Sequence, residues 1–556
     1  MRKQLFLFST LGLALAFLAW YFLVGSTDDE NPNSLINSNL KVTWVNQNAE
    51  FFEAAQDLNH LELYLKSIRH PLAVEQKLSR MENQPLFISF KSWSFSPLHQ
   101  GYSGVLKTII AGGYDQQLKL LAKYLKIRDT TTYLAFNPYP ELPEKGAPWQ
   151  MQQPQLYLES FIHMAQIIRE NAPAVQLVFL ASGYPGCMEY HPGDSIIDAN
   201  ALVLYPPAEE RFDAYPIYDS AEYHLLRRLH RFRWSEKTCL ILTDTAQSQL
   251  NVDGTKILAE QKSLEESLQI PLTSNRHKPT NFLVGLYDPK KRLLAHPRVA
   301  AEHIFINWHN THEPELRAQI KALEARGDAL ILTVEPFKDA AANHDRRVLE
   351  NILEGRYDAT LDSVYDLLNS IQTTVYLRFA HEMEIPIERY PWQSQNPLTY
   401  IKAYRYFMNY HGDLPRHIFK VWGPAGDRGS LEWYPGEDAV DFISLAIYGL
   451  PDKNIEDHRK QERFREIFNR KQWRMRQVTA PIFITEFGVK GPDDFQKKWL
   501  QEAGKVLHRA PRVVGACYFN LYDNPKVWGK GEAPDWSISE EAFETFCQAA
   551  QRPEMN

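Results

Sequence analysis

The chain has 556 residues, 44% of them hydrophobic, and a formal net charge of −7 at pH 7. Its length can hold two or three domains, each with its own core, while the acidic balance and the lack of Lys/Arg clusters argue against a nucleic-acid partner. The four cysteines lie far apart and show no zinc-type spacing, so the sequence indicates neither a metal site nor a disulfide framework, and no cofactor is expected.

The N-terminal segment predicts a membrane anchor. Leu5–Val24 is a run of twenty residues without a charge, long enough to cross the hydrocarbon core at about 1.5 Å per residue. Positive charges precede this run and negative charges follow it, which places the N-terminus in the cytoplasm and the bulk of the chain in the periplasm or outside. A single-pass inner (cytoplasmic) membrane protein is expected, with stub and anchor at 1–27 and a linker at 28–38. The alternative is a cleaved signal peptide, disfavoured because Trp20-Tyr21-Phe22 stands where small residues are needed.

Most of the remaining chain repeats itself at an offset of 243 positions (376 − 133). Ile109–Phe136 aligns with Ile352–Phe379 without a gap. The identical pairs include Gly112/Gly355, Tyr114/Tyr357, Asp115/Asp358, Tyr133/Tyr376 and Phe136/Phe379. A repeat of this size indicates a duplicated domain rather than a solenoid. The two copies are expected over residues 39–275 and 276–556.

The first copy reads as a barrel with one strand missing. Seven short apolar runs predict its strands: Leu40–Trp44, Leu61–Leu65, Leu86–Phe90, Thr132–Phe136, Leu177–Ala181, Ala201–Tyr205 and Cys239–Thr243. The one candidate for an eighth strand, Leu268–Leu272, is weak. This barrel is therefore expected to be incomplete or to be closed in an unusual way.

The second copy alternates apolar runs with amphipathic stretches, which is typical of βα units around a parallel sheet. The predicted strands are Phe282–Tyr287, Ile304–Trp308, Ala329–Val334, Thr374–Phe379, Ile418–Trp422, Phe442–Ile447, Ile482–Thr485 and Val513–Phe519. Eight strands over about 250 residues match a (β/α)₈ barrel. The predicted fold is thus α/β: two tandem (β/α)₈ barrels after a transmembrane helix, the first of them degenerate.

Two glutamates suggest the chemistry of the second copy. Glu382 and Glu486 follow the fourth and seventh predicted strands, at the end of a barrel where reactive groups lie. A protonated and an ionised carboxyl group facing each other are what glycosidic bond cleavage requires. Glu382 would protonate the leaving oxygen and later activate water, and Glu486 would attack the anomeric carbon. For Glu335 and Glu384 a solvated or salt-bridged side chain is the favoured interpretation.

Several ordered motifs of the second copy resemble glycoside hydrolase family 26, which belongs to the large clan of retaining (β/α)₈ hydrolases. These motifs are Arg378–Glu384, Tyr390-Pro391-Trp392, Trp433–Glu437 and Ile484–Gly488. The resemblance implies endo-cleavage of a β-linked polysaccharide of the mannan, xylan or mixed-linkage glucan type. It also implies that His381 orients the acid/base or the substrate and that Tyr448 hydrogen-bonds the nucleophile. The chain departs from the family at Glu384, where asparagine is usual, and in the loop 385–395, so the substrate is less defined than the reaction.

Four further residues remain open between two interpretations. Trp392 and Trp422 could form the floor of sugar subsites or could be packing residues, because aromatic faces suit both roles. Trp528, in the loop after the eighth strand, is a weaker candidate for a subsite. Arg378 could be a buried ion-pair partner or could point toward the site.

In the first copy Tyr139 and Asp244 occupy the positions of the two glutamates, so this copy is expected to be inactive. It could bind a glycan chain or act as a spacer. The whole chain is predicted to be a membrane-anchored retaining endo-β-glycanase, whose partners are a polysaccharide, the membrane and, from the predicted topology, polysaccharide export machinery. The alternatives are a non-hydrolytic glycan-binding or assembly subunit and a transglycosylase.

Overall fold

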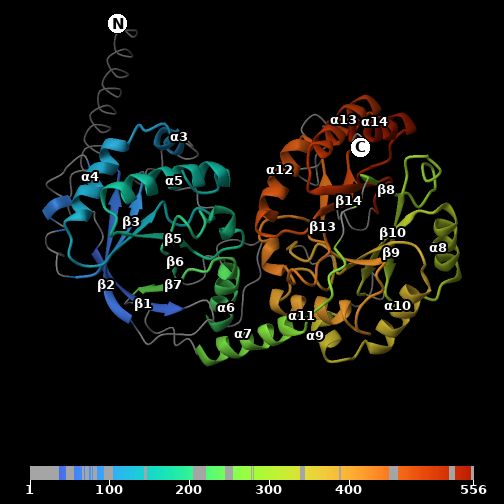
Figure 1. Ribbon diagram of the computed structural model, residues 1–556, viewed down its shortest axis with the longest axis horizontal. Helices are drawn as coiled ribbons and strands as arrows, with labels where there is room; N and C mark the ends of the chain where they lie inside the picture. Colours follow the sequence, from blue (N-terminus) through green and yellow to red (C-terminus); the bar gives the residue numbers. More distant parts are fainter. Residues whose placement is uncertain are drawn as a thin grey trace, which may run out of the picture. The chain divides into compact units, whose positions relative to one another are not determined.

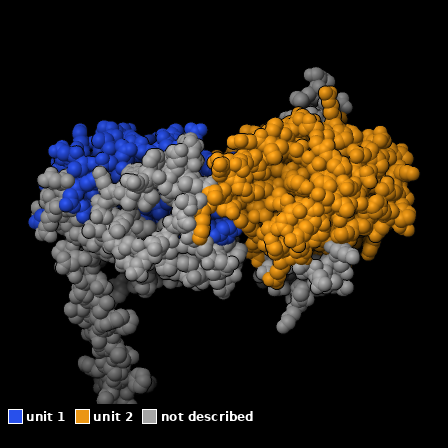
Figure 2. Space-filling model, turned by 90° about the horizontal axis from the view of Figure 1, so that it is seen from below, with its two compact units in different colours: residues 1–208, 220–254 blue, residues 209–219, 255–556 orange. Residues whose placement is uncertain are grey.

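The computed structural model describes most of the two predicted copies (Figure 1). The described residues are 37–45, 55–65, 68, 74–76, 78, 84–92, 104–142, 147–203, 221–244, 254–276, 279, 281–337, 345–386, 390–449, 461–524 and 533–551. The predicted anchor lies outside them, and within them no helix has the length and apolar character needed to cross a membrane. The chain divides into two compact units, residues 1–208 with 220–254 and residues 209–219 with 255–556 (Figure 2).

Unit 1 contains a closed barrel of seven strands among the described residues. The strands are β1 (Asn37–Val45), β2 (Ala55–Tyr64), β3 (Leu86–Lys91), β4 (Thr132–Phe136), β5 (Gln176–Ala181), β6 (Ala199–Val203) and β7 (Cys239–Asp244). From β2 to β7 neighbouring strands run parallel, but β1 is antiparallel to both of its neighbours, β2 and β7. Its helices are α3 (Gly104–Ile110), α4 (Asp115–Lys126), α5 (Pro154–Asn171) and α6 (Ala221–Arg231).

The expectation of a degenerate first barrel, with seven strands and an unusual closure, is therefore confirmed. Leu40 pairs with Leu58 of β2 on one side and with Asp244 of β7 on the other, so one reversed strand closes the barrel that the sequence left open. Leu268–Leu272, the weak candidate for an eighth strand, is not a strand. Helix α7 (Gly254–Gln269) takes in its first residues, and the backbone N–H of Leu272 donates to the Asp438 side chain at 3.1 Å.

Unit 2 contains a closed parallel barrel of eight strands among the described residues, as the sequence predicts. The strands are β8 (Leu283–Tyr287), β9 (Ala301–Asn307), β10 (Ala329–Glu335), β11 (Val375–Phe379), β12 (Ile418–Trp422), β13 (Phe442–Tyr448), β14 (Ile482–Gly488) and β15 (Val513–Phe519). Strand β15 pairs with β8 and closes the ring, with Gly515 opposite Leu283. Buried side chains such as Ile331, Tyr376 and Phe483 fill the barrel interior, so the barrel is a packed core rather than a pore.

The helices of unit 2 surround this barrel (Figure 1). They are α7, α8 (Pro314–Arg326), α9 (Val348–Leu353), α10 (Asp358–Ser370), α11 (Pro397–Met408), α12 (Phe464–Arg474), α13 (Asp493–His508) and α14 (Glu540–Ala550). Local sequence sets their ends: α8 has Pro314 in its first turn and stops at Gly327, whose φ of 76° is the left-handed conformation that glycine adopts at little cost.

Helix α7 and the segment after it belong to unit 2. Arg405 of α11 donates to the carbonyl oxygens of Ser267 at 3.1 Å and Leu268 at 3.2 Å and forms an ion pair with Asp438 at 2.8 Å. Further along, the backbone N–H of Asn275 donates to Asp441 at 2.7 Å. The compact units therefore divide at residues 254/255, upstream of the 275/276 boundary that the sequence suggested.

Candidate active site

The site is built around Glu486, whose carboxylate is held from two sides. Glu486 lies on β14 and is 6% exposed. Arg378 of β11 forms an ion pair with its Oε1 atom, and the hydroxyl of Tyr448, at the end of β13, donates to its Oε2 atom at 2.9 Å. Charge-assisted hydrogen bonds of this kind stabilise a carboxylate and fix its direction. The partner of Glu486 that the family resemblance implies, Tyr448, thus lies in contact with it.

Two hydrogen bonds and an aromatic ring fix the position of the buried Arg378 side chain. The side chain is 1% exposed. Its Nε atom donates to Thr333 Oγ1 at 2.8 Å, and its Nη1 atom donates to Thr485 Oγ1 at 2.9 Å. The guanidinium carbon also lies 5.5 Å from the ring centre of Phe305. Both interpretations of Arg378 therefore hold, because it is a buried ion-pair partner and it points at the site.

Glu382 stands on a strained turn just after β11. Its φ is 53° and that of Ala380 is 47°, a conformation that residues other than glycine rarely adopt. Two hydrogen bonds hold the turn: the Glu382 N–H donates to Gly423 O at 2.8 Å, and Gln393 Nε2 donates to Glu382 O at 3.1 Å. Strain of this kind persists where the surroundings fix the backbone, and it is frequent at functional sites.

His381 lies within this turn and is 3% exposed. Its carbonyl oxygen accepts a hydrogen bond from Trp392 Nε1 at 2.7 Å. Its Nε2 atom lies 4.0 Å from Glu335 Oε1, and its ring meets Phe305 edge-on with centroids 5.9 Å apart. The residue before Glu382 therefore faces the interior of the site.

Glu335 is a third carboxyl group of this site, and sequence reasoning did not assign it there. It ends β10, and its side chain is 13% exposed. Burial raises the pKa of Glu335 to about 8, with the charges of Glu486 and Glu382 adding to the effect and Arg378 opposing it. Glu335 is therefore mostly protonated at neutral pH. The signal that could have found it is its place at a strand end, which it shares with Glu382 and Glu486.

Trp392 and Trp422 are both 0% exposed. Trp392 stacks on Tyr390 with centroids 4.6 Å apart and planes 3° from parallel, and Trp422 meets Tyr434 edge-on at 5.1 Å. A sugar ring needs an open aromatic face, so in this structure both tryptophans are packing residues. Trp528, the third tryptophan of the prediction, lies outside the described residues.

Other rings, which sequence reasoning missed, are open in part at the ends of the strands. Tyr287 ends β8 and Phe519 ends β15, and their centroids lie 4.6 Å apart. Phe337 follows β10 and stacks on Tyr390 at 5.9 Å and 16°. All four side chains are partly exposed, so these rings are the described surfaces on which a sugar could stack.

Glu384 lies near Glu382 in sequence but has a structural role. Its carboxylate accepts hydrogen bonds from the N–H groups of Gly426 at 2.9 Å and Asp427 at 3.0 Å and from Ser430 Oγ at 2.8 Å. Burial, followed by the charge of Asp427, raises the pKa of Glu384. It therefore fastens the segment after β12 to the chain that follows Glu382.

Unit 1 contains a turn of the same geometry but lacks the two glutamates. Tyr139 replaces Glu382 (382 − 139 = 243) and has a similar φ of 58°. Trp149 Nε1 donates to Pro138 O at 2.9 Å, as Trp392 does to His381 O, and Gln150 Nε2 donates to Tyr139 O at 3.2 Å, as Gln393 does to Glu382 O. The strained turn is therefore present in both barrels, and only unit 2 has a carboxyl group on it.

Comparison with known proteins found two curated relatives, and no family model matches the chain. A β-1,3-xylanase of an Alcaligenes species is 26% identical over 200 residues, which is 35% of this chain and 37% of the relative. The β-1,3-xylanase TXYA of a Vibrio species is 26% identical over 147 residues, 25% of this chain and 28% of the relative. The matched region thus spans only about a third of these relatives.

Among solved structures, GH26C of a Muricauda species has 15% identity and a TM-score of 0.37, covering 54% of this chain and 92% of its own. A GH26 β-mannanase of Bacteroides ovatus has 16% identity and a TM-score of 0.35, covering 53% of this chain and 93% of its own. By sequence, the chain is therefore similar over part of its length to proteins named β-1,3-xylanases.

Proposed function

We propose that unit 2 is a retaining endo-β-glycanase. The observation that carries this proposal is the geometry at Glu486: a buried arginine and a tyrosine hydroxyl hold its carboxylate from two sides. Glu382 stands on a strained turn at the same end of the barrel, and its charge acts on both Glu335 and Tyr448. The named relatives support the same reaction class, because xylanases cleave glycosidic bonds.

The proposed reaction has two steps. In the first, Glu486 attacks the anomeric carbon while Glu382 donates its proton to the leaving glycosidic oxygen. In the second, Glu382, now ionised, takes a proton from water, which attacks the same carbon and releases Glu486. Arg378 holds Oε1 and Tyr448 holds Oε2 of the Glu486 carboxylate, so little reorganisation is needed as its charge moves to the substrate.

The substrate to test first is β-1,3-xylan, because both named relatives are β-1,3-xylanases. β-1,4-Xylan, β-mannan and mixed-linkage β-glucan follow from the wider family resemblance. The partly exposed rings of Tyr287, Tyr390 and Phe519 are suited to the apolar faces of any of these sugars.

For the rest of the chain we propose a supporting role. Unit 1 would be a degenerate, non-catalytic duplicate, since Tyr139 occupies the position of Glu382 and a phenol, with an ordinary pKa of about 10, is a much weaker acid than a carboxyl group. It would bind glycan or separate unit 2 from the membrane, to which Leu5–Val24 would anchor the chain. An enzyme anchored at the inner membrane would act on a polysaccharide during export.

The test is release of reducing ends from these four polysaccharides by the purified full-length chain, beside Glu382→Ala and Glu486→Ala. The proposal predicts release from at least one polysaccharide by the wild type and its loss in both variants. Lengthened products would instead indicate transglycosylation. Binding without any release would point to a non-hydrolytic role and contradict the proposal.

A further inference from the structure

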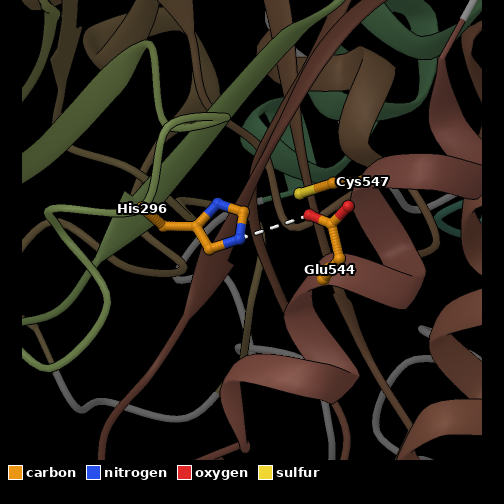
Figure 3. A group of neighbouring side chains, drawn as sticks. All are labelled: His296, Glu544 and Cys547. Atoms are coloured by element: carbon orange, nitrogen blue, oxygen red, sulfur yellow. Dashed lines mark ion pairs between the residues drawn. The ribbon is translucent and has the colours of Figure 1, made fainter.

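Three side chains that could hold a metal ion converge outside the candidate active site. His296 lies in the connection between β8 and β9, and Glu544 and Cys547 lie on α14 (Figure 3). One ligand atom from each residue lies within 4.8 Å of the other two. The His296 Nε2 atom is 3.2 Å from Glu544 Oε2. Among the residues that the structure describes, this is the one such group of three or more.

The arrangement follows from the fold rather than from a sequence motif. Glu544 and Cys547 are three residues apart on one helix, so their side chains share a face. Helix α14 packs along α13, and the ring of Phe543 meets His296 edge-on with centroids 5.1 Å apart. That contact brings His296, from the other end of unit 2 in sequence, over the two ligands on the helix.

The three donors together suit zinc. An imidazole nitrogen, a carboxylate oxygen and a thiolate sulfur are its usual protein ligands, at about 2.0–2.3 Å from the metal. Neighbouring ligands of a tetrahedral ion are then about 3.5 Å apart, so the side chains must close by roughly 1 Å. Cys547 is 1% exposed and the His296 side chain 6%, whereas the Glu544 side chain is 33% exposed. Glu544 therefore lies on the side from which an ion and a completing water could enter.

The local charges do not prevent a cation from binding. Burial raises the pKa of the Cys547 thiol to about 12, the charge of Glu544 adds to this, and Arg298 opposes it. Without a metal the thiol is therefore neutral, and an ion must displace its proton. Arg298 is the nearby cation, and Gln551, turned so that its amide oxygen faces the guanidinium, accepts from it at 2.8 Å. To bind the ion through Nε2, His296 must carry its proton on Nδ1. Nδ1 then no longer accepts the long hydrogen bond of 3.3 Å from the backbone N–H of Arg298.

We propose that His296, Glu544 and Cys547 bind one zinc ion, with water as the fourth ligand. The ion would fasten the connection after the first strand of the unit 2 barrel to its last helix. Each ligand comes from outside the candidate active site, so the ion would take no part in the glycanase reaction. The proposal is independent of the glycanase assignment, so either can fail alone.

The test is titration of the purified, metal-free full-length chain with Co²⁺, a spectroscopic substitute for zinc, followed by competition with Zn²⁺. We expect one Co²⁺ per chain, a sulfur-to-cobalt charge-transfer band, and displacement of the cobalt by zinc. Cys547→Ser should abolish the band, and His296→Ala should weaken binding by more than about tenfold. Cys187→Ser, which removes another buried free cysteine, is the control and should leave the band unchanged.

Glu544→Gln keeps the proposal testable if Cys547→Ser does not fold. The Glu544 side chain is partly exposed and glutamine has nearly the same shape, so this variant should fold. It should retain the charge-transfer band but bind cobalt more than about tenfold more weakly. Zinc should also raise the melting temperature of the wild type and not that of Cys547→Ser. Absence of stoichiometric binding, or a thiolate band that persists in folded Cys547→Ser, would overturn the proposal.

Discussion

Arg378 and Glu486 form an ion pair in which the two side chains are only 1% and 7% exposed. They come from strands β11 and β14, which are not neighbours in the sheet, so the pair crosses the barrel interior. Two charges can be buried in this way only if each is satisfied, and here the threonine hydroxyls around Arg378 and the hydroxyl of Tyr448 complete both sides. The candidate nucleophile is thus part of the core of the barrel.

Removing the cation should therefore destabilise the protein. Arg378→Met leaves the Glu486 carboxylate buried without its partner, and we expect the free energy of unfolding to fall by about 3–5 kcal/mol. Denaturant unfolding of the full-length chain measures this. Arg347→Met is the matched control, because the side chains of the Arg347–Glu354 pair are 64% and 42% exposed and screened by water, so less than about 1 kcal/mol is expected. Equal effects of the two substitutions would contradict the account.

The hydroxyl of Tyr448 should contribute to the reaction as well as to the fold. A hydrogen bond to a charged group contributes about 1.5–3 kcal/mol, so Tyr448→Phe should lower kcat by about 10- to 150-fold. Steady-state kinetics on the substrate that the wild type cleaves measures the effect. Tyr522→Phe removes a hydroxyl from a tyrosine that is 42% exposed and should leave kcat unchanged. A wild-type kcat in Tyr448→Phe would exclude this role.

Substitution of Glu382 and substitution of Glu486 should affect activity in different ways. Glu382→Ala removes the proton donor, so activity on the polysaccharide should fall by about 10²- to 10⁴-fold, while an aryl glycoside with a good leaving group should suffer less. Azide should restore turnover of that aryl glycoside by replacing water in the second step. Glu486→Ala lacks the nucleophile, so azide can only attack the anomeric carbon directly and give the inverted α-glycosyl azide, whereas Glu382→Ala should give the β-glycosyl azide. A β-glycosyl azide from Glu486→Ala, or an α-glycosyl azide from Glu382→Ala, would contradict the assigned roles.

Glu335 should make stability depend on pH. Its pKa of about 8 in the folded protein is above the ordinary value of 4.5, so the folded state binds this proton more tightly than the unfolded state does. The resulting stabilisation is fully present below about pH 4.5 and is lost as the pH rises through about 8. Between these limits Glu335 should lower the free energy of unfolding by up to about 1.4 kcal/mol per pH unit.

Glu335→Gln removes this titration and keeps the shape of the side chain. Between pH 5 and pH 8 the free energy of unfolding of the wild type should therefore fall relative to that of Glu335→Gln. Denaturant unfolding of both proteins across this range measures the difference. Glu354→Gln, at a side chain that is 42% exposed, should show a much smaller shift. If the difference for Glu335→Gln does not change with pH, Glu335 is not protonated in the folded protein.

The second barrel was predictable because each of its strands is rich in apolar residues. A strand buried on both faces must have this composition, and Ile418–Trp422 is the same segment in the prediction and in β12. The first barrel was predictable in its strands but not in its closure. Strand direction is not encoded in hydrophobicity, and so the antiparallel pairing of β1 with β2 and β7 could not be read from the sequence.

The sequence predicted which site residues stand at strand ends, but not which of their side chains are buried. Position at a strand end indicated Glu486 and Tyr448, which are in contact. The same pattern could not distinguish an aromatic ring that faces the opening from one that packs behind it, and Trp392 and Trp422 pack behind it. Glu335 was left out because a single carboxyl group at a strand end is usually solvated. Its burial, together with the charges of residues on other strands, raises its pKa and gives it a distinct chemistry.

The most direct test of the central claim is the anomeric configuration of the product in the first minutes of hydrolysis, followed by ¹H NMR with the full-length chain. The account predicts that the β-anomer appears first and then mutarotates, because two displacements at one carbon restore the original configuration. Neither Glu382→Ala nor Glu486→Ala should yield this signal. If the α-anomer appears first, or if either variant still releases product at the wild-type rate, double displacement by Glu382 and Glu486 is wrong.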